Sequence, residues 1–289
     1  MNAWKILFSR WLIKRNFMYE TVFLLLIGIL SGVFGALLGI GGGTFVVPLL
    51  VIFLHFPIHQ AVAISLISII ATSSSVASAN VYNKITNMKL GITLELATTI
   101  GAIVGSFIGS LLPGNVIMLI FSFVMAFIAY FMYYHKDVGV SANAGQLKSL
   151  YASSYYDYAL KKNIDYDVKN LSAGMTISAF AGAFSGMLGI GGGVLKVPAM
   201  NAFCKVPIKV AAATSNFMIG VTAAAGAFIY FGKGYVKNPL FVSLIVIGVV
   251  LGSKLSMPII KYLPPSRIKN IFILFLVYLA IEMFVRGIR

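Results

Sequence analysis

The chain has 289 residues, of which 60% are hydrophobic and 10% are charged, and its mean hydropathy is +0.96. Soluble domains carry about 25% charged residues, so this composition excludes a soluble globular protein and predicts an integral membrane protein. The net charge of +15 comes from short basic clusters between apolar runs, which argues against nucleic-acid binding because no basic stripe is formed. The single cysteine, Cys204, excludes an intramolecular disulfide and a multi-cysteine metal site.

Four basic residues precede the first apolar run, residues 21–38, in the manner of a signal peptide. The run has a counterpart at residues 177–188, so it is one of two repeated units. We therefore expect it to remain in the protein as a membrane helix.

The first half is predicted to contain a series of membrane helices with one interruption. In chain order these are a helix over 21–38, a glycine break, a short segment over 44–56, and helices over 60–83, 90–112 and 115–134. The second half follows the same order. We predict an all-α integral membrane protein, a multi-pass bundle of two homologous repeats with Gly-rich helix breaks and about eight crossings (8–10). The expected divisions are a first repeat half at 1–135, a polar, tyrosine-rich connecting loop at 136–170 and a second repeat half at 171–289.

The duplication is visible as a repeated hexapeptide, because Leu38–Gly43 returns unchanged as Leu188–Gly193. At the same offset, Pro48 pairs with Pro198, Ser65 with Ser215 and Thr72 with Thr222. The fourth helix of each half needs a three-residue shift, which aligns Gly101 and Gly105 with Gly248 and Gly252. Small residues at four-residue spacing predict close approach of helix backbones.

The path of each broken segment through the membrane has two interpretations. If it makes a single crossing, 15 basic residues lie inside and 5 outside. If it forms two crossings or a re-entrant hairpin, the repeats are inverted and the count is about 8 inside to 12 outside. The positive-inside rule favours the first interpretation, and the prevalence of inverted repeats among transporters favours the second. Both place the two termini in the cytoplasm; the first also places the connecting loop there, where its tyrosines could form a small surface hairpin.

The glycine breaks are the first candidate site. Consecutive backbone N–H groups at a helix start attract an anion, and glycine lets the ligand approach the chain. Matching breaks in two halves point to the substrate site of a secondary transporter. The candidate glycines are Gly39, Gly41, Gly42, Gly43, Gly189, Gly191, Gly192 and Gly193.

Lys196 is the second candidate, because it follows the second break inside an apolar segment where Val46 occupies the paired position. A lysine near the membrane interior costs at least about 2.5 kcal/mol and usually faces a partner or an aqueous pathway. We interpret it as the cationic anchor of an anionic substrate, with snorkelling to the interface as the alternative. Glu95 could pair with Lys196 or exchange a proton as a coupling group. Hydroxyls and an amide that could line the path are Ser65, Thr214, Ser215 and Asn216. No metal site and no cofactor are expected.

The motifs together are those of a known family. GIGGG followed by Val-Pro in each half, Lys196–Pro198, Ala213–Asn216 and Gly234–Val236 resemble the sulfite exporter TauE/SafE family over nearly all of both halves. The resemblance implies a multi-pass permease of the cell membrane that moves sulfite, organosulfonates or other sulfur-containing organic acids, usually outward. Its partners would then be a small anionic substrate and the lipid bilayer. The alternatives are a permease for a carboxylate or a metal ion, and a membrane enzyme acting on lipid.

Overall fold

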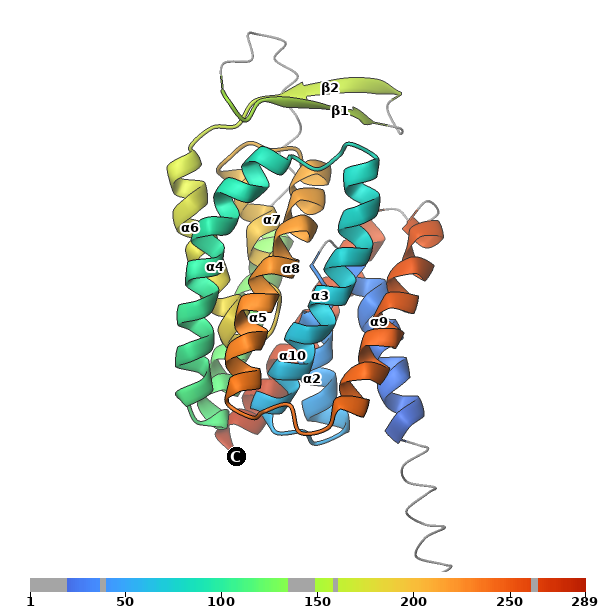
Figure 1. Cartoon of the computed structure of the whole chain (residues 1–289), viewed down its shortest axis with the longest axis vertical. Helices are drawn as coiled ribbons and strands as arrows, with labels where there is room; N and C mark the ends of the chain where they lie inside the picture. Colours follow the sequence, from blue (N-terminus) through green and yellow to red (C-terminus); the bar gives the residue numbers. More distant parts are fainter. Residues whose placement is uncertain (1–19, 37–39, 135–148, 158–160, 261–264) are drawn as a thin grey trace, which may run out of the picture.

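The computed structural model describes residues 20–36, 40–134, 149–157, 161–260 and 265–289. In chain order its elements are a first helix Glu20–Ala36, α2 Gly43–Phe53, α3 Ile58–Tyr82, α4 Met88–Leu111, α5 Gly114–Tyr134, β1 Ser153–Asp157, β2 Lys162–Tyr166, α6 Leu171–Leu188, α7 Gly193–Ala202, α8 Ile208–Gly232, α9 Pro239–Ile260 and α10 Pro265–Ile288. Among the described residues, six helices are long and apolar enough to cross a membrane: α3, α4, α5, α6, α8 and α9. The chain is a helical, multi-pass membrane protein (Figure 1).

The two ends of the bundle are marked by different contacts. Near the end of α10, Arg286 donates hydrogen bonds to the carbonyls of Val51 and Ile52, so α2 and α10 finish at the same end. At the other end Asn87, which caps α4, donates to the carbonyl of Tyr151 and to the hydroxyl of Tyr166. The β-hairpin and the C-terminus therefore lie at opposite ends of the molecule (Figure 1).

Glycine-mediated crossings fix the direction of the outer helices. The first helix packs on α9, where a Cβ at Gly28 would lie 2.6 Å from the carbonyl oxygen of Ile245, and one at Gly32 would overlap the carbonyl of Val249. The residue numbers rise together along both helices from the first contact to the second, so the first helix and α9 run parallel. On the other side of the bundle α6 lies parallel to α4, where Gly101 and Gly105 meet the carbonyls of Ala179 and Ala183. The predicted role of the small residues is confirmed.

The repeats are inverted. The link before α9 lies beside the end of α4, since Tyr235 donates to the carbonyl of Ser110, so α9 and the first helix both start at the C-terminal end. Because α2 returns to that end, the first helix and α2 form a helical hairpin that enters and leaves on one side. The pair α6 and α7 does the same from the side of the β-hairpin (Figure 1).

Two expectations are therefore wrong. A single crossing by each broken segment is excluded, and the described part of the connecting loop does not share a face with the C-terminus. The physical reason is the backbone of the breaks, where Gly41 and Gly42 have φ of 85° and 76° and Gly191 and Gly192 have φ of 79° and 70°. Left-handed residues of this kind reverse the chain, and glycine adopts them without steric cost. The number of crossings stays a prediction.

The predicted tyrosine-rich hairpin is present and covers one end of the bundle. Its strands are antiparallel, with Tyr155 opposite Ile164. One face of the hairpin is buried and packs with Leu90 of α4, Met200 of α7 and Val210 of α8 in one apolar cluster. This contact places a compact cap over the helices that carry the second glycine break.

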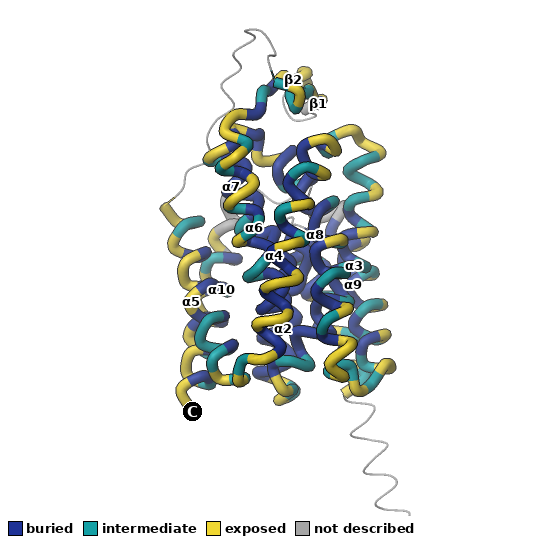
Figure 2. The backbone as a smooth tube through the Cα atoms, turned by 60° about the vertical axis from the view of Figure 1, so that its left-hand side comes forward, coloured by how far each residue is buried: buried dark blue, intermediate teal, exposed yellow. Residues whose placement is uncertain are grey.

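The interior of the bundle is formed by α2, α3 and α8, whose buried residues appear as dark tube in Figure 2. The outward faces of α4, α5 and α10 carry large exposed apolar side chains, including Ile100, Phe127 and Leu274. In a membrane protein such surfaces face the lipid, where they need no protein partner.

Candidate substrate site

The two glycine breaks meet in the middle of the molecule. A Cβ at Gly43 would overlap the carbonyl of Gly189, and one at Gly191 would lie 3.2 Å from the carbonyl oxygen of Ile40. Gly41 and Gly191 both lie against the side chains of Ile69 and Ile219, which are at the midpoints of α3 and α8. The breaks thus face each other at half the depth of the bundle.

Each break also presents a helix N-terminus to this centre. α2 begins after Gly42 and α7 after Gly192; neither cap residue offers a side-chain hydrogen bond, and neither first turn contains an acidic residue. The partial positive charge of a helix N-terminus is therefore uncompensated at both starts. Such ends favour an anion between them.

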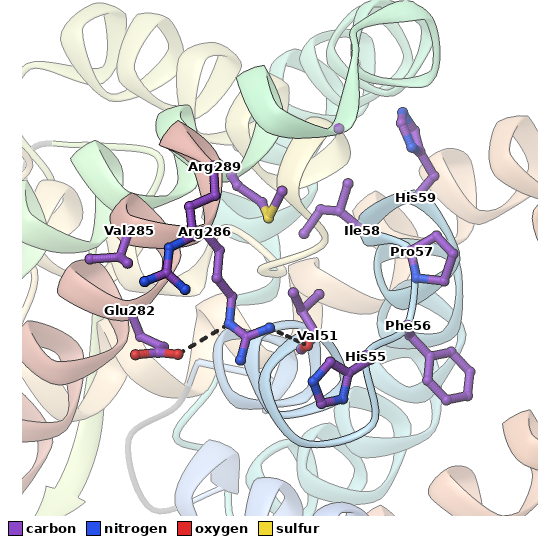
Figure 3. Close-up of a pocket in the computed structure, with 12 residues that line it drawn as sticks. Val51, His55, Phe56, Pro57, Ile58, His59, Glu282, Val285, Arg286 and Arg289 are labelled. Atoms are coloured by element: carbon purple, nitrogen blue, oxygen red, sulfur yellow. Dashed lines mark hydrogen bonds and ion pairs between the residues drawn. The ribbon is translucent and has the colours of Figure 1, made fainter.

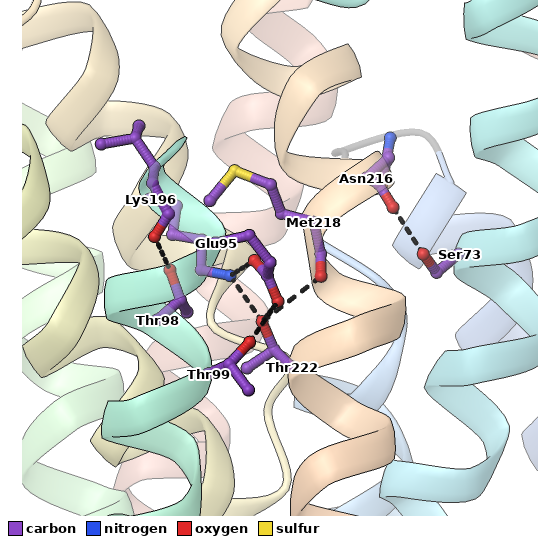
Figure 4. A network of polar contacts seen from close by, with 9 residues as sticks. Ser73, Glu95, Thr98, Thr99, Lys196, Asn216, Met218 and Thr222 are labelled. Carbon is purple, nitrogen blue, oxygen red and sulfur yellow. Dashed lines mark hydrogen bonds and ion pairs between the residues drawn. The ribbon is translucent and has the colours of Figure 1, made fainter. Parts of the chain in front are cut away.

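A buried ion pair lies one turn beyond the second break. The Nζ of Lys196 on α7 is 3.5 Å from Oε2 of Glu95 on α4, and the lysine side chain is 0% exposed. Thr222 on α8 joins the pair, since its hydroxyl accepts from Lys196 at 2.9 Å and donates to Glu95 Oε1 at 2.6 Å. Thr99 donates a further bond to Oε1 at 3.2 Å. Three helices thus converge on one charge pair (Figure 4).

The polar groups near the breaks are not all satisfied. Oε2 of Glu95 accepts no hydrogen bond, and buried hydroxyls without a partner in the described structure include those of Ser31, Thr44 and Ser185. The position of a Cβ on Gly192 is 3.4 Å from the Ser185 hydroxyl, which places that hydroxyl at the start of α7. Buried polar atoms normally have partners, so a group of free hydroxyls at two helix starts is suited to a polar ligand.

The predicted site residues fall into three groups. Gly41, Gly42, Gly43, Gly189, Gly191, Gly192 and Gly193 line the breaks, and Lys196 and Glu95 form the adjacent pair. Ser65 donates to the carbonyl of Gly189 at 2.6 Å, so its proton ties α3 to the second break. Gly39 lies outside the described residues.

The remaining predicted residues are not gathered at one point. Thr214 accepts from the backbone N–H of Asn87 at the start of α4. Asn216 accepts through its carbonyl from Ser73 on α3, so it lies on a different face of α8 from Thr222 (Figure 4). Ser215 is buried and unpartnered.

Four hydroxyls were missed by the sequence analysis: those of Ser31, Thr44, Thr99 and Ser185. All four are serines or threonines within apolar helices, where sequence alone does not separate packing residues from lining residues. The repeat supplied no signal, since Ala181, Val194 and Gly35 occupy the paired positions of Ser31, Thr44 and Ser185.

The ion pair is formed once and joins the two halves, since Lys196 lies in the second half and Glu95 in the first. Val46 takes the counterpart position of Lys196, and Val246 takes that of Glu95 in the register of the glycine crossings between the outer helices. Val46 is buried and Val246 is partly buried, and both belong to one apolar cluster, while Thr72 matches Thr222. The packing is therefore charged behind the second break and apolar behind the first.

Comparison with known proteins agrees with this architecture. The profile of the family described as "Sulfite exporter TauE/SafE" matches residues 24–283. The chain is 28% identical over 278 residues to the probable membrane transporter protein YunE of Bacillus subtilis, covering 92% of this chain and 98% of that protein. It is 28% identical over 265 residues to a probable membrane transporter protein of Methanocaldococcus jannaschii, covering 85% and 88%.

A probable membrane transporter protein of Haemophilus influenzae is 29% identical over 285 residues, covering 91% of this chain and 97% of that protein. No solved structure matches the chain. The family match spans both glycine breaks, the ion pair and every long helix. The chain belongs to the sulfite exporter TauE/SafE family of membrane transporters.

Proposed function

We propose that the protein is a permease for small anions, with sulfite and organosulfonates as the substrate class, and that it works by alternating access rather than as an enzyme. The observation that carries the proposal is the buried Lys196–Glu95 pair beside two facing, uncapped helix starts. Backbone N–H groups, free hydroxyls and one lysine are donors, which sulfite and sulfonate oxygens accept. The inverted repeats support alternating access, because each pair of helices enters from its own face.

Lys196 can hold an anion only after its contact with Glu95 is weakened. In the empty site the two charges cancel, and adding an anion alone would leave one net negative charge in a buried position. Uptake of a proton by Glu95 together with the anion keeps the net charge at zero, which avoids the cost of an uncompensated buried charge. We therefore assign Glu95 to proton coupling, with one proton moving with each monovalent anion.

This coupling sets the ratio of protons to anions that move together, and it does not set the direction in which they move. Outward movement, as in the family name, then requires a cytoplasmic excess of the anion that exceeds the opposing proton gradient. Oxidised or unwanted sulfur acids that accumulate inside a cell would meet this condition.

We further propose that the end carrying the β-hairpin faces the cytoplasm. Among the described residues in links and end turns, seven basic residues lie at that end: Lys84, Lys89, Lys161, Lys162, Lys169, Lys205 and Lys209. Four lie at the opposite end: Lys233, Lys237, Arg286 and Arg289. The positive-inside rule favours the first group in the cytoplasm and the C-terminus outside, and this proposal replaces the cytoplasmic C-terminus expected from the sequence.

The test is flux into proteoliposomes of labelled sulfite, methanesulfonate and a monocarboxylate such as acetate, each with the parent protein and Lys196→Met. We expect sulfite and methanesulfonate to enter through the parent at rates that the variant loses. Entry of the carboxylate alone would reassign the substrate class. Equal flux of parent and variant would show that Lys196 does not hold the anion.

A further inference from the structure

A polar pocket lies at the C-terminal end of the bundle, away from the glycine breaks. It has a volume of about 620 Å³ and is lined by residues from α2, the following link, α3, α5 and α10, including His55, His59, Glu282, Arg286 and Arg289 (Figure 3). It lies beside the outer end of α2, whose 11 residues separate it from the first break by about 16 Å. The pocket is therefore distinct from the proposed substrate site.

The side-chain charge in this pocket is unbalanced. Among the described lining residues Glu282 supplies the one side-chain carboxylate, and it is already engaged by Nε of Arg286 at 3.1 Å. Arg286 also donates to carbonyls in the last turn of α2. It therefore caps that helix and also contributes a positive charge to the pocket. Among the described residues, the Arg289 side chain has no counterion and no hydrogen-bond partner, and it extends along the same rim (Figure 3).

Two helix starts add to this positive field. Ile58 and His59 begin α3, Gly114 begins α5, and all three line the pocket. Neither first turn contains an acidic residue. The His59 ring contacts the carbonyl of Leu112 at 2.9 Å and stacks on Tyr235. These two contacts hold the ring in one position in the pocket lining.

We propose that this pocket binds an oxyanion group, a phosphate, sulfate or sulfonate, through Arg289, Arg286 and His55. Arg289 supplies an unpaired planar donor set that matches oxyanion oxygens. The group reaches the pocket either as a free anion or as the headgroup of an acidic phospholipid, because α10 presents exposed Val285 and Ile288 next to it. The proposal does not depend on the proposed transport function.

The test is the melting temperature of the purified full-length protein with two probes, sodium sulfate at matched ionic strength in detergent, and phosphatidylglycerol against phosphatidylcholine in nanodiscs. The pocket variant is His55→Asn with Arg289→Gln. Asparagine tolerates the positive φ of 54° at position 55, so the link keeps its shape. Lys237→Gln, an exposed lysine at the same end and outside the pocket lining, controls for the lost charge.

We expect sulfate, phosphatidylglycerol or both to raise the melting temperature of the parent and of Lys237→Gln by about 2 to 4 °C, with no rise in the pocket variant. A response to sulfate assigns a free anion as a ligand, and a response to phosphatidylglycerol alone assigns a lipid headgroup. The same rise in the pocket variant, or no rise in the parent with either probe, would overturn the proposal. Because flux through Lys196 is not the readout, neither result bears on the transport proposal.

Discussion

The two glycine breaks are backed by different packing. Behind the second break, Lys196, Glu95 and Thr222 form a buried polar cluster, and behind the first break, Val46, Val246 and Thr72 occupy the counterpart positions at an apolar core. The apolar side shows that this arrangement of helices does not need an ion pair to pack. A buried ion pair gives little net stability over well-packed apolar residues. The charged side is therefore best explained by function.

The largest effect on stability and flux is expected when one residue of the Lys196–Glu95 pair is replaced and the other is kept. Lys196→Val leaves Glu95 buried without its counter-charge, and Glu95→Val does the same to Lys196. Each single variant should lose about 3 to 5 kcal/mol of stability, and each should lose flux. Thermal melting in detergent measures the first effect and proteoliposome uptake the second.

The double variant Glu95→Val with Lys196→Val separates stability from function. It gives the packing behind the second break the valines found behind the first, so we expect it to melt near the parent temperature while transporting no anion. A matched control, Val46→Ala, perturbs the apolar side without touching charge and should keep its substrate specificity. A double variant that transports like the parent would remove the pair from the transport mechanism.

A smaller effect is expected at the second glycine break. Alanine at Gly192, where φ is 70°, adds about 1 to 2 kcal/mol of backbone strain and brings its Cβ within 3.1 Å of Ser185. Gly234→Ala is the matched control, because its φ of 74° carries the same strain while no atom lies within 4 Å of the added Cβ. Both variants should fold with similar loss of melting temperature. Only Gly192→Ala should lose flux; equal flux in the two variants would argue against a ligand at the break.

Single exposed cysteines should perturb the protein least. They test whether the two ends of the bundle lie on opposite sides of the membrane and which end faces the cytoplasm. Cysteines at Ser154 on the hairpin and at Glu20, both exposed, are placed one at a time in a background without Cys204. That background is a precaution, because Cys204 is buried and burial raises the pKa of its thiol, which lowers its reactivity. An impermeant thiol reagent on intact cells should label Glu20→Cys, and should label Ser154→Cys only after permeabilisation. The reverse pattern would invert the orientation, and labelling of both would contradict the arrangement of the ends.

Much of the fold could be predicted from the sequence. The expected helices at 60–83, 90–112 and 115–134 correspond to α3, α4 and α5 with starts and ends within two residues, because long apolar runs and their turn residues mark them. The predicted three-residue shift between α4 and α9 is not reproduced in the glycine crossings, because Gly101 meets the carbonyl of Ala179 while Gly252, not Gly248, meets the paired carbonyl of Ile29. The reversal at each break could not be predicted, because glycine permits both a kink and a return, and the count of basic residues favoured a single crossing.

The site was predicted in part. A deep lysine without a counterpart and one deep carboxylate were sufficient to suggest the pair Lys196 and Glu95, since each needs a partner in an apolar setting. The role of Ser65 in joining α3 to the second break was not predictable, because it depends on the position of the Gly189 carbonyl. The unpartnered hydroxyls of Ser31, Thr44 and Ser185 become visible only when the helices are packed.

The central claim is that Glu95 takes up a proton when Lys196 binds an anion. The direct measurement is simultaneous methanesulfonate uptake, internal pH and membrane potential in proteoliposomes, since this sulfonate stays anionic near neutral pH. The account predicts one proton entering with each anion and no change in potential for the parent. It also predicts loss of proton movement in Glu95→Gln, which has similar shape without the titrating group. Anion uptake that builds a potential with no change in internal pH, or proton-coupled uptake by Glu95→Gln at the parent rate, would contradict it.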